Sequence, residues 1–405
     1  MLKRIQLHWQ ILIALVLSII FGITLPAYVK YVSWMGDVFL RALQMIIVPL
    51  IFSSIVSGVT GIGSGQNLGR MTLKTIGYYI TTSLFAIVTG LILVNIIRPG
   101  VGADLGLSAN VEGLAASGDS FGQTLINIIP TNIVESMVRG DLPSIIFFAI
   151  FFGFFATRVM PQYSESVVNF FNGIFEIMMK VTLFVIKFTP LGVFGIVSVI
   201  VAENGDNLLA LFSSMGVYMI TVLGALFIHA FVTLPLLTKF IGKANPVKHA
   251  RNMSVPLLTA FSTSSSSATL PLTMESVEFK SGVSNKTTSF VLPLGATINM
   301  DGTALYQCIA VLFIAQAYGV ELTIIQQFIV IITALLASIG AAGIPMAGLV
   351  IISIILSAVG LPLEGVGLIL AVDRILDMVR TSVNVWSDSC GAVIIAKSEG
   401  ESTYV

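Results

Sequence analysis

The sequence contains few charged residues, few histidines and only two cysteines. Of its 405 residues, 10% are Asp, Glu, Lys or Arg, whereas soluble domains carry about 25%. Cys308 and Cys390 both lie in apolar stretches, which excludes a disulfide framework and a CxxC metal site. His8, His229 and His249 are scattered, which argues against zinc catalysis. The 20 basic residues balance the 20 acidic residues and form no basic block, so nucleic acid is not expected as a partner.

Apolar residues, in contrast, make up 56% of the chain, and they occur in long runs. A bilayer core of about 30 Å needs ~20 apolar residues per helix. Such runs near residues 9–29, 35–60, 72–97, 121–157, 165–199 and 208–238 predict six spans before residue 240. The first run is too long for a signal peptide, and further spans follow it. Because Lys and Arg concentrate in cytoplasmic loops, the N-terminus and the basic cluster at 239–251 are expected in the cytoplasm, and residues 99–122 then form a long outer loop.

After residue 252, polar residues lie inside the apolar segments instead of between them. Residues 259–271 contain a serine run and a proline between two short apolar arms, which predicts a re-entrant hairpin whose tip lines a cavity. A solvated serine-rich surface loop is the alternative. Residues 338–348 predict a second hairpin, and the long run 290–317 between the two is interrupted at 299–303, which predicts a broken helix.

The two halves of this region have the same spacing. Pro271 precedes Thr303 by about as many residues as Pro345 precedes Asp377, roughly 32 in each half, so each hairpin is followed by a polar helix at a matching offset. Paired interrupted segments of this kind predict an inverted-repeat transporter with its site at the repeat interface. Chance similarity between stretches of small residues is the alternative.

The last helix carries the strongest signal, because Asp373, Asp377, Arg380, Asn384 and Asp388 fall on one stripe of a 3.6-residue helix. An ionisable side chain at the bilayer centre costs about 2.5 to 3.5 kcal/mol on the insertion scale, so these groups are expected to face protein or water.

Arg380 is the expected partner of a substrate carboxylate, because its planar fork of donors matches two carboxylate oxygens. Asp377, one turn earlier, suits an ammonium group. The pair therefore predicts an acidic α-amino acid as substrate, or a dicarboxylate if Asp377 is only structural. The alternative is that Arg380 simply pairs within its own helix with Asp377 and Asn384.

Hard oxygen ligands in the same region predict a small cation, and sodium is the implied ion. They are supplied by Asn299, Asp301, Asn384 and Asp388. Tyr79, Thr82 and Ser83 in the third span add hydroxyls that suit another ion site, although such a triplet is also typical of helix packing.

Enzymatic functions find little support in the sequence. It contains no GxSxG elbow, HExxH motif or Walker loop. The serine run at 264–267 lacks a nearby base, which an intramembrane hydrolase would need.

Several motifs resemble those of the dicarboxylate/amino acid:cation symporter family, the glutamate transporters. They are residues 264–271 (SSSSATLP), 299–303 (NMDGT), 343–345 (GIP) and 373–381 (DRILDMVRT), with further similarity at 128–132 and 142–148. The resemblance implies an all-α multi-pass membrane protein with eight transmembrane helices and two re-entrant helical hairpins in inverted repeats. It also implies a homotrimer in membrane lipid that works as an elevator, with the second hairpin as the gate.

The same resemblance divides the chain into expected domains. Residues 1–70 would form scaffold helices 1 and 2, and 71–98 would form helix 3 of the transport domain. Residues 99–200 would contain the outer loop and scaffold helices 4 and 5, and 201–240 helix 6 of the transport domain. Residues 241–405 would hold hairpin 1, broken helix 7, hairpin 2 and helix 8, with the substrate and ion sites.

The resemblance also implies roles for individual residues. Arg380 would bind the substrate side-chain carboxylate and Asp377 the amino group, while Asn384 and the backbone region of Ser265 and Ser266 would bind the α-carboxylate. The rest of the substrate pocket would comprise Thr303, Thr381 and the backbone from Ile344 to Gly348. The first sodium site would use Asn384, Asp388 and the carbonyls of Gly295 and Asn299; the second the carbonyls of Thr297, Met300, Ser338, Ile339 and Ala341; and the third Tyr79, Thr82, Ser83, Asn299 and Asp301.

Departures from the family pattern refine this prediction. Gln307 stands where eukaryotic members carry a proton-transporting glutamate, which argues against proton countertransport by that route. Asp388 favours sodium, and Arg380 favours aspartate or glutamate over neutral amino acids. Ser264 and Met378 occupy places where the family commonly has a further arginine, so Asp377 is expected to lack that partner.

The sequence therefore predicts a sodium-driven importer of L-aspartate or L-glutamate in the inner (plasma) membrane, with cytoplasmic termini and no organic cofactor. The alternatives are a C4-dicarboxylate symporter, a proton-coupled glutamate symporter or a substrate-gated anion conductance.

Overall fold

The computed structural model describes residues 7–62, 69–102, 126, 129–140, 142–203, 208–339 and 347–405, and every regular element among them is helical. The predicted all-α class is therefore confirmed for these residues. The helices are α1 (Leu7–Thr24), α2 (Ser33–Ile62), α3 (Gly69–Ile97), α5 (Ile133–Arg139), α6 (Leu142–Ala156), α7 (Pro161–Ile186), α8 (Thr189–Glu203), α9 (Leu208–Ile228), α10 (Leu234–Phe240), α11 (Pro246–Asn252), α12 (Ser254–Thr263), α13 (Ser266–Glu275), α14 (Asn285–Ile298), α15 (Asp301–Ala317), α16 (Ile324–Ile339), α17 (Ala347–Ala358) and α18 (Val366–Ser398). Short 3₁₀ or π turns lie at η1 (Pro26–Tyr31), η2 (His229–Thr233), η3 (Ser276–Lys280) and η4 (Leu363–Gly365).

Several of these helices are suited to a membrane. Those long and apolar enough to cross one, within the described part of the chain, are Ser33–Thr60, Arg70–Ile97, Pro161–Ile186, Ser213–Phe240 and Asn285–Ala317. Shorter apolar helices accompany them at Trp9–Thr24, Ser144–Ala156, Thr189–Glu203 and Ile324–Ser338. The protein is therefore an integral membrane protein, as its composition predicts.

Two predicted spans differ from the structure because each is divided. The run near 165–199 forms two helices, α7 and α8, that meet at Lys187. Pro190 in the first turn of α8 has no N–H, so it cannot extend the hydrogen bonds of α7. Within 121–157, the described residues form α5 and α6, and Gly140 ends α5 at a φ of 71° that favours glycine.

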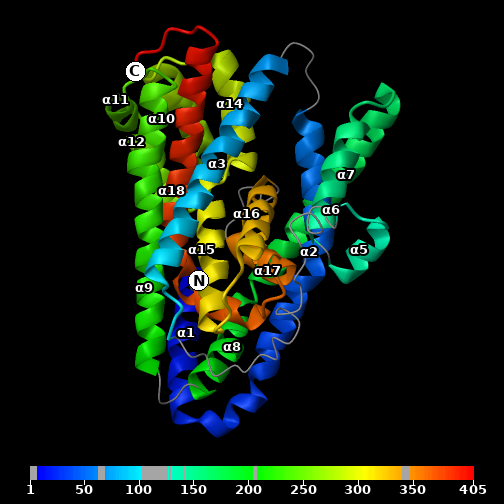
Figure 1. The fold of residues 1–405 in the computed structure, drawn as a ribbon, viewed down its shortest axis with the longest axis vertical. Coiled ribbons are helices and arrows are strands. Elements are labelled where there is room, and N and C mark those ends of the chain that lie inside the picture. The colour runs from blue at the N-terminus through cyan, green and yellow to red at the C-terminus, as the bar shows by residue number, and fades with distance from the viewer. Residues whose placement is uncertain are drawn as a thin grey trace, which may run out of the picture.

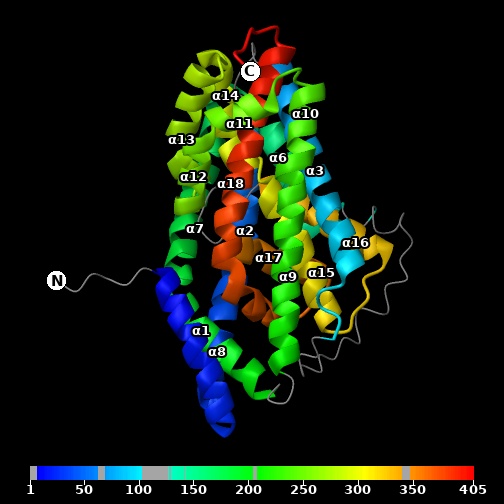
Figure 2. The ribbon, with the colours of Figure 1, turned by 90° about the vertical axis from the view of Figure 1, so that its left-hand side faces the viewer.

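The helices pack in two groups. In the first helix group, α2 contacts α6, α7 and α8, and α1 contacts α8. A Cβ on Gly195 would lie 2.5 Å from the backbone nitrogen of Gly36, so α8 and α2 touch backbone to backbone. In the second helix group, α3 packs along α15, while α18 contacts α9, α12, α14 and α15. Figures 1 and 2 show α18 beside α9, with α2, α6 and α7 standing apart from them in Figure 1.

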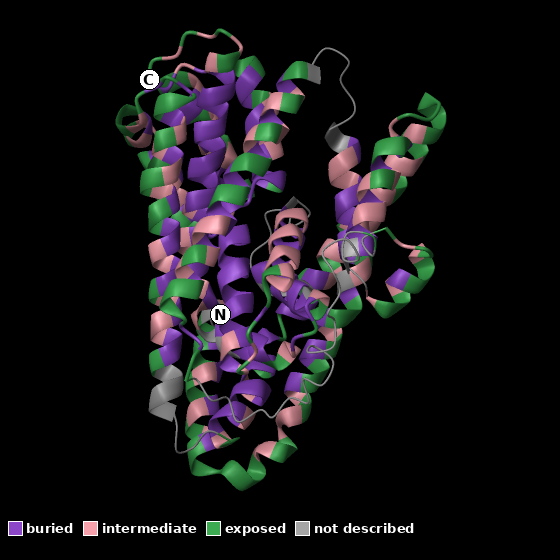
Figure 3. Cartoon of the chain, viewed as in Figure 1, coloured by how far each residue is buried: buried purple, intermediate pink, exposed green. Residues whose placement is uncertain are grey.

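The centre of the second helix group is deeply buried. All of α15 except Gln316 is buried, and α18 is buried along most of its length (Figure 3). Because α18 carries several charges into this interior, those charges have to be paired with groups of the protein or of a bound substrate.

The helix break expected within 299–303 lies at Asn299 and Met300. Asn299 has φ −96° and ψ 88°, and Met300 has φ −115° and ψ 59°, so neither is helical. The carbonyl oxygens next to the break are engaged by the backbone: Asn299 N–H donates to Gly295 (2.8 Å), and Ala304 N–H donates to Met300 (2.8 Å).

The serine run of 264–267 joins two short helices, α12 and α13, that contact each other. Ser264 ends α12 in the left-handed region (φ 51°), and the Ser265 hydroxyl then accepts a hydrogen bond from Ala268 N–H (3.2 Å) to cap α13. The second pair, α16 and α17, also makes contact, but its connection at residues 340–346 lies outside the described residues.

Two acidic residues that follow α18 tie its end to neighbouring helices. Glu399 pairs with Arg70 (2.7 Å) and Lys74 (2.5 Å) at the start of α3. Hydrogen bonds from these two side chains lower the pKa of Glu399 to about 2. The Glu401 carboxylate accepts a hydrogen bond from the Thr287 hydroxyl (2.5 Å) in the first turn of α14. The end of α18 is therefore fixed against both α3 and α14.

Candidate functional site

The predicted polar stripe of α18 is buried, and Arg380 forms its centre. The side chain of Arg380 lies 2.6 Å from the Asp377 carboxylate and 3.3 Å from the Asp373 carboxylate. Its guanidinium carbon lies 4.3 Å from the centroid of the Tyr306 ring on α15, in cation–π geometry. Two carboxylates and a ring therefore hold the guanidinium in one orientation.

Gly348 on α17 gives the Arg380 guanidinium its space. A Cβ at position 348 would lie 2.9 Å from Nη1, 3.0 Å from Nη2 and 3.2 Å from Cζ. The backbone of α17 therefore approaches the two terminal nitrogens of the predicted carboxylate binder. Ile344, also predicted for this wall, lies outside the described residues.

The intrahelical alternative for Arg380 is observed in part. Arg380 does pair with Asp377, but Asn384 takes other partners. Its Oδ1 accepts from Gly302 N–H (2.8 Å), and its Nδ2 donates to the Thr303 hydroxyl (3.1 Å). Asn384 therefore bridges α18 to the first turn of α15, where Thr303 was predicted to line the substrate pocket.

Asp377 has a second basic neighbour that the sequence analysis did not identify. Arg374 Nη1 lies 3.8 Å from Asp377 Oδ2, although this oxygen accepts no hydrogen bond from the described residues. One oxygen of Asp373 is likewise buried without a hydrogen-bond partner in the described part of the chain. Two arginines therefore balance two carboxylates, and each carboxylate keeps an oxygen available to a further donor.

The helices α12 and α13, predicted as the first hairpin, pack beside this cluster. Helix α12 contacts α18, where the Ser382 hydroxyl donates to the Leu257 carbonyl (3.0 Å). Ser266 is buried at the start of α13, and Ser265 caps that helix. Thr381 is buried on α18 next to Arg380.

A second polar cluster surrounds Asp301, which is fully buried at the start of α15. Its Oδ1 accepts a hydrogen bond from the Ser83 hydroxyl (2.6 Å) and lies 3.3 Å from the Thr82 hydroxyl, both on α3. The other oxygen, Oδ2, lies 2.5 Å from the Ser387 hydroxyl and 3.1 Å from His229 Nε2. The structure thus brings together most of the predicted third sodium site.

Asn299 joins this cluster to Asp388. Its Oδ1 lies 3.4 Å from the Thr82 hydroxyl, and its Nδ2 donates to Asp388 Oδ1 (2.9 Å) and to the Ser387 hydroxyl (3.0 Å). The Tyr79 hydroxyl donates instead to the carbonyl oxygen of Val291 (2.7 Å).

Gly295 on α14 brings Tyr79 and Asp388 together. A Cβ on Gly295 would lie 2.7 Å from the Tyr79 hydroxyl oxygen and 2.6 Å from Asp388 Oδ1, so only glycine leaves room for both. These carboxylate, amide and hydroxyl oxygens are the hard ligands that suit a small cation such as sodium.

The predicted second sodium site is described only in part. Met300 lies at the break and is buried, Ser338 is buried near the end of α16, and Thr297 is exposed. Helix α14 contacts α16, which brings these segments together. Ile339 ends α16, and Ala341 lies outside the described residues.

Sequence reasoning missed His229, Ser387 and Arg374. His229 was treated as one of three scattered histidines, yet it is fully buried against Asp301. A single histidine inside an otherwise apolar span was the available signal, because a buried imidazole needs a partner. Ser387 and Arg374 lie on α18 between residues that were identified.

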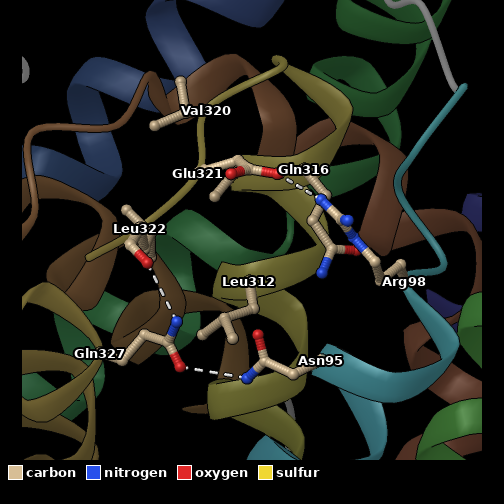
Figure 4. A pocket seen from close by; sticks show the side chains of 9 residues that line it. Asn95, Arg98, Leu312, Gln316, Val320, Glu321, Leu322 and Gln327 are labelled. Carbon is tan, nitrogen blue, oxygen red and sulfur yellow. Dashed lines mark hydrogen bonds and ion pairs between the residues drawn. The ribbon is translucent and has the colours of Figure 1, made fainter. Parts of the chain in front are cut away.

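A separate polar cavity of about 280 Å³ lies where the other ends of α3 and α15 meet, next to α16 (Figure 4). Its side chains bind one another: Arg98 pairs with Glu321 (2.5 Å), and Asn95 donates to Gln327 (3.0 Å). Gln316 Nε2 donates to the Val94 carbonyl (3.2 Å). The Gln316 contact ties α15 to α3, and the Asn95 contact ties α3 to α16.

Comparison with known proteins agrees with this geometry. A family model described as the sodium:dicarboxylate symporter family matches residues 7–398. The chain is 36% identical over 413 residues to the proton/glutamate-aspartate symporter of Escherichia coli (strain K12), covering 98% of this chain and 93% of the relative. It is 37% identical over 410 residues to the proton/sodium-glutamate symport protein of Geobacillus stearothermophilus, covering 99% and 96%. It is 35% identical over 451 residues to excitatory amino acid transporter 3 of Mus musculus, covering 96% and 85%. These relatives are transporters and not enzymes, and the chain belongs to the sodium:dicarboxylate symporter family.

Proposed function

We propose that this protein is a secondary active symporter that imports L-aspartate or L-glutamate, driven by a sodium gradient. The observation that carries the substrate assignment is the buried Arg380 guanidinium facing Gly348 of α17. A planar fork of donors at such a place suits a carboxylate. The nearby Asp377, with one oxygen that accepts no hydrogen bond from the residues the structure describes, suits the substrate ammonium group.

Sodium is supported by the second cluster. Hydroxyl, amide and carboxylate oxygens form one connected network there, supplied by Thr82, Ser83, Asn299, Asp301 and Asp388. Such oxygens bind hard cations. The carbonyl oxygens of Gly295 and Met300 next to the break each accept one backbone hydrogen bond and keep a second lone pair for an ion. The relatives are named for sodium as well as proton coupling. The two carboxylates of this network favour sodium for this chain.

We further propose the expected elevator architecture of eight spans and two re-entrant hairpins. The first helix group (α1, α2, α6, α7 and α8) suits a scaffold, because its members pack mainly on one another. The second helix group carries both polar clusters and suits a transport domain. The α16–α17 pair would act as the gate, since Gly348 contacts Arg380. A homotrimer in the inner (plasma) membrane, with both termini cytoplasmic, completes the proposal.

A C4-dicarboxylate symporter is the second candidate, and one observation favours it. Asp377 is already engaged by Arg380 at 2.6 Å, with Arg374 at 3.8 Å. If these arginines hold Asp377 permanently, it has only a structural role and the substrate needs no ammonium group.

Uptake by the purified transporter in liposomes tests the proposal. Labelled L-aspartate is supplied under an inward sodium gradient, and separately under a matched proton gradient without sodium. Glutamate, succinate and serine are the competitors. We expect sodium-dependent accumulation that glutamate blocks and succinate does not. Accumulation driven by protons alone would contradict the sodium assignment, and strongest inhibition by succinate would contradict the amino acid assignment.

A further inference from the structure

Asp301 has its two carboxylate oxygens in different surroundings. Oδ1 faces Ser83 and Thr82 of α3, which are candidate sodium ligands. Oδ2 faces Ser387 of α18 and His229 of η2, which the family resemblance does not assign to any ion site. A carboxylate oxygen accepts about two hydrogen bonds, so protein donors occupy Asp301 on both sides.

The two sides respond differently to a cation. A hydroxyl can rotate its hydrogen away and turn an oxygen lone pair toward an ion, so Ser83 and Thr82 can exchange donation for coordination. The N–H of an imidazole has no lone pair to offer, and its contact with Asp301 Oδ2 persists when an ion arrives. His229 is therefore suited to hold one oxygen of the carboxylate while the other coordinates.

The hydrogen bond also defines the form of the imidazole. A carboxylate only accepts, so Nε2 of His229 carries the proton in this contact. Among the described residues, Nδ1 of His229 is buried without a hydrogen-bond partner. A fully buried imidazole with one unsatisfied nitrogen destabilises the fold. Its hydrogen bond to Asp301 is the favourable contact that this position makes.

The local backbone places His229 with precision. It begins η2, a single π-helical turn between α9 and α10, and such turns are frequent at functional sites. The next residue, Ala230, accepts a hydrogen bond from the Trp386 indole N–H of α18 (3.0 Å). The turn is thus tied to the helix that also carries Ser387.

We propose that His229 is a positioning residue of the sodium site. It fixes Oδ2 of Asp301, together with Ser387, so that Oδ1 is presented to the ion alongside the hydroxyls of α3. This inference rests on the proposed sodium coupling. In this role His229 contacts neither sodium nor the amino acid, and it acts by donating a hydrogen bond to Asp301.

The test compares two substitutions of His229 in the full-length transporter. His229→Gln keeps an N–H donor near the position of Nε2, whereas His229→Leu removes it at similar volume. The sodium concentration for half-maximal L-aspartate uptake and the sodium-induced rise in Tm without substrate are measured. Loss of a supporting partner of a metal ligand typically costs 10–100-fold in metal affinity. We expect about that shift for His229→Leu, less than about threefold for His229→Gln, and an unchanged aspartate Kd at saturating sodium.

Two further variants make the outcome decisive. Ser387→Ala removes the other donor to Oδ2 and should shift sodium affinity in the same direction, which keeps the test valid if His229→Leu folds poorly. Thr221→Val removes a buried hydroxyl of α9 that donates to the Val217 carbonyl of its own helix, and it should leave sodium affinity unchanged. Equal shifts in the Leu and Gln variants of His229, or no shift in His229→Leu and Ser387→Ala, would overturn the positioning role alone. A wild-type transporter indifferent to sodium would overturn the proposed coupling and this inference together.

Discussion

Replacing Arg380 by alanine removes the group on which the substrate assignment depends. A charge-assisted hydrogen bond contributes about 1.5–3 kcal/mol, so a bidentate pair with a carboxylate is worth roughly 3–6 kcal/mol. In the structure the guanidinium already pairs with Asp377 at 2.6 Å and Asp373 at 3.3 Å. Binding a substrate carboxylate therefore contributes only the free energy in excess of these existing pairs, so we use the lower end of the range, about 3 kcal/mol. Arg380→Ala should therefore weaken the binding of acidic substrates by about 10²-fold, because about 1.4 kcal/mol corresponds to a factor of ten in Kd.

The same substitution affects the fold, so the design needs a control. Removing one member of a buried ion pair costs about 3–5 kcal/mol, since it leaves unpaired charge in the interior. Asp373 and Asp377 would both lose their nearest cation. Adding Asp373→Asn to Arg380→Ala removes one of these charges and should recover part of the lost Tm without recovering aspartate uptake. Uptake and competition by serine are then measured at matched amounts of folded protein. Aspartate uptake within about threefold of wild type in either variant would refute the role of Arg380.

Two further predictions follow from contacts outside this pair. Gly348→Ala places a methyl group 2.9 Å from Arg380 Nη1 and displaces the guanidinium, so aspartate binding should weaken about tenfold. The control is Gly224→Ala on α9, whose added methyl group meets nothing within 4 Å. Equal aspartate Kd values for the two variants would contradict this geometry. Arg70 and Lys74 lower the pKa of Glu399 from 4.5 to about 2, so the stability this contact contributes is fully present above pH 4.5 and lost as the pH falls toward 2. Glu399→Gln should therefore lower Tm at pH 7 and flatten its decline between pH 4.5 and 2, and superimposable Tm profiles would contradict that role.

Sequence patterns predicted those features that local chemistry determines. The stripe from Asp373 to Asp388 follows from helical spacing alone, and its burial follows from the cost of charge in a bilayer. The break at Asn299 and Met300 follows from a carboxylate, a glycine and an amide inside a long apolar run. Both depend on residues close together in the sequence.

Features that depend on distant partners were not predictable in the same way. The contact of His229 with Asp301 joins residues 72 positions apart, across a π turn that no local pattern marks. The contact of Arg374 with Asp377 was missed because it depends on side-chain conformation on α18. The division between α7 and α8 was not predicted from hydropathy, because the apolar run continues through Pro190. Hydropathy does not take into account that proline lacks the N–H needed to continue a helix.

The packing of α3 against α15 has a consequence for synthesis in the cell. The partner of Ser83 in this interface lies 218 residues further along the chain, which a ribosome at about 5–20 residues per second needs roughly 10–40 s to reach. During that interval α3 has to remain in lipid with its hydroxyls unpaired to Asp301. Several of them already bond to carbonyls of their own helix, as Thr75, Thr82 and Thr89 do to Met71, Tyr78 and Phe85. These threonines can therefore satisfy their hydroxyls within α3 before the rest of the chain is made, whereas Ser83 and Tyr79 receive their partners, Asp301 and Val291, only when α14 and α15 are translated.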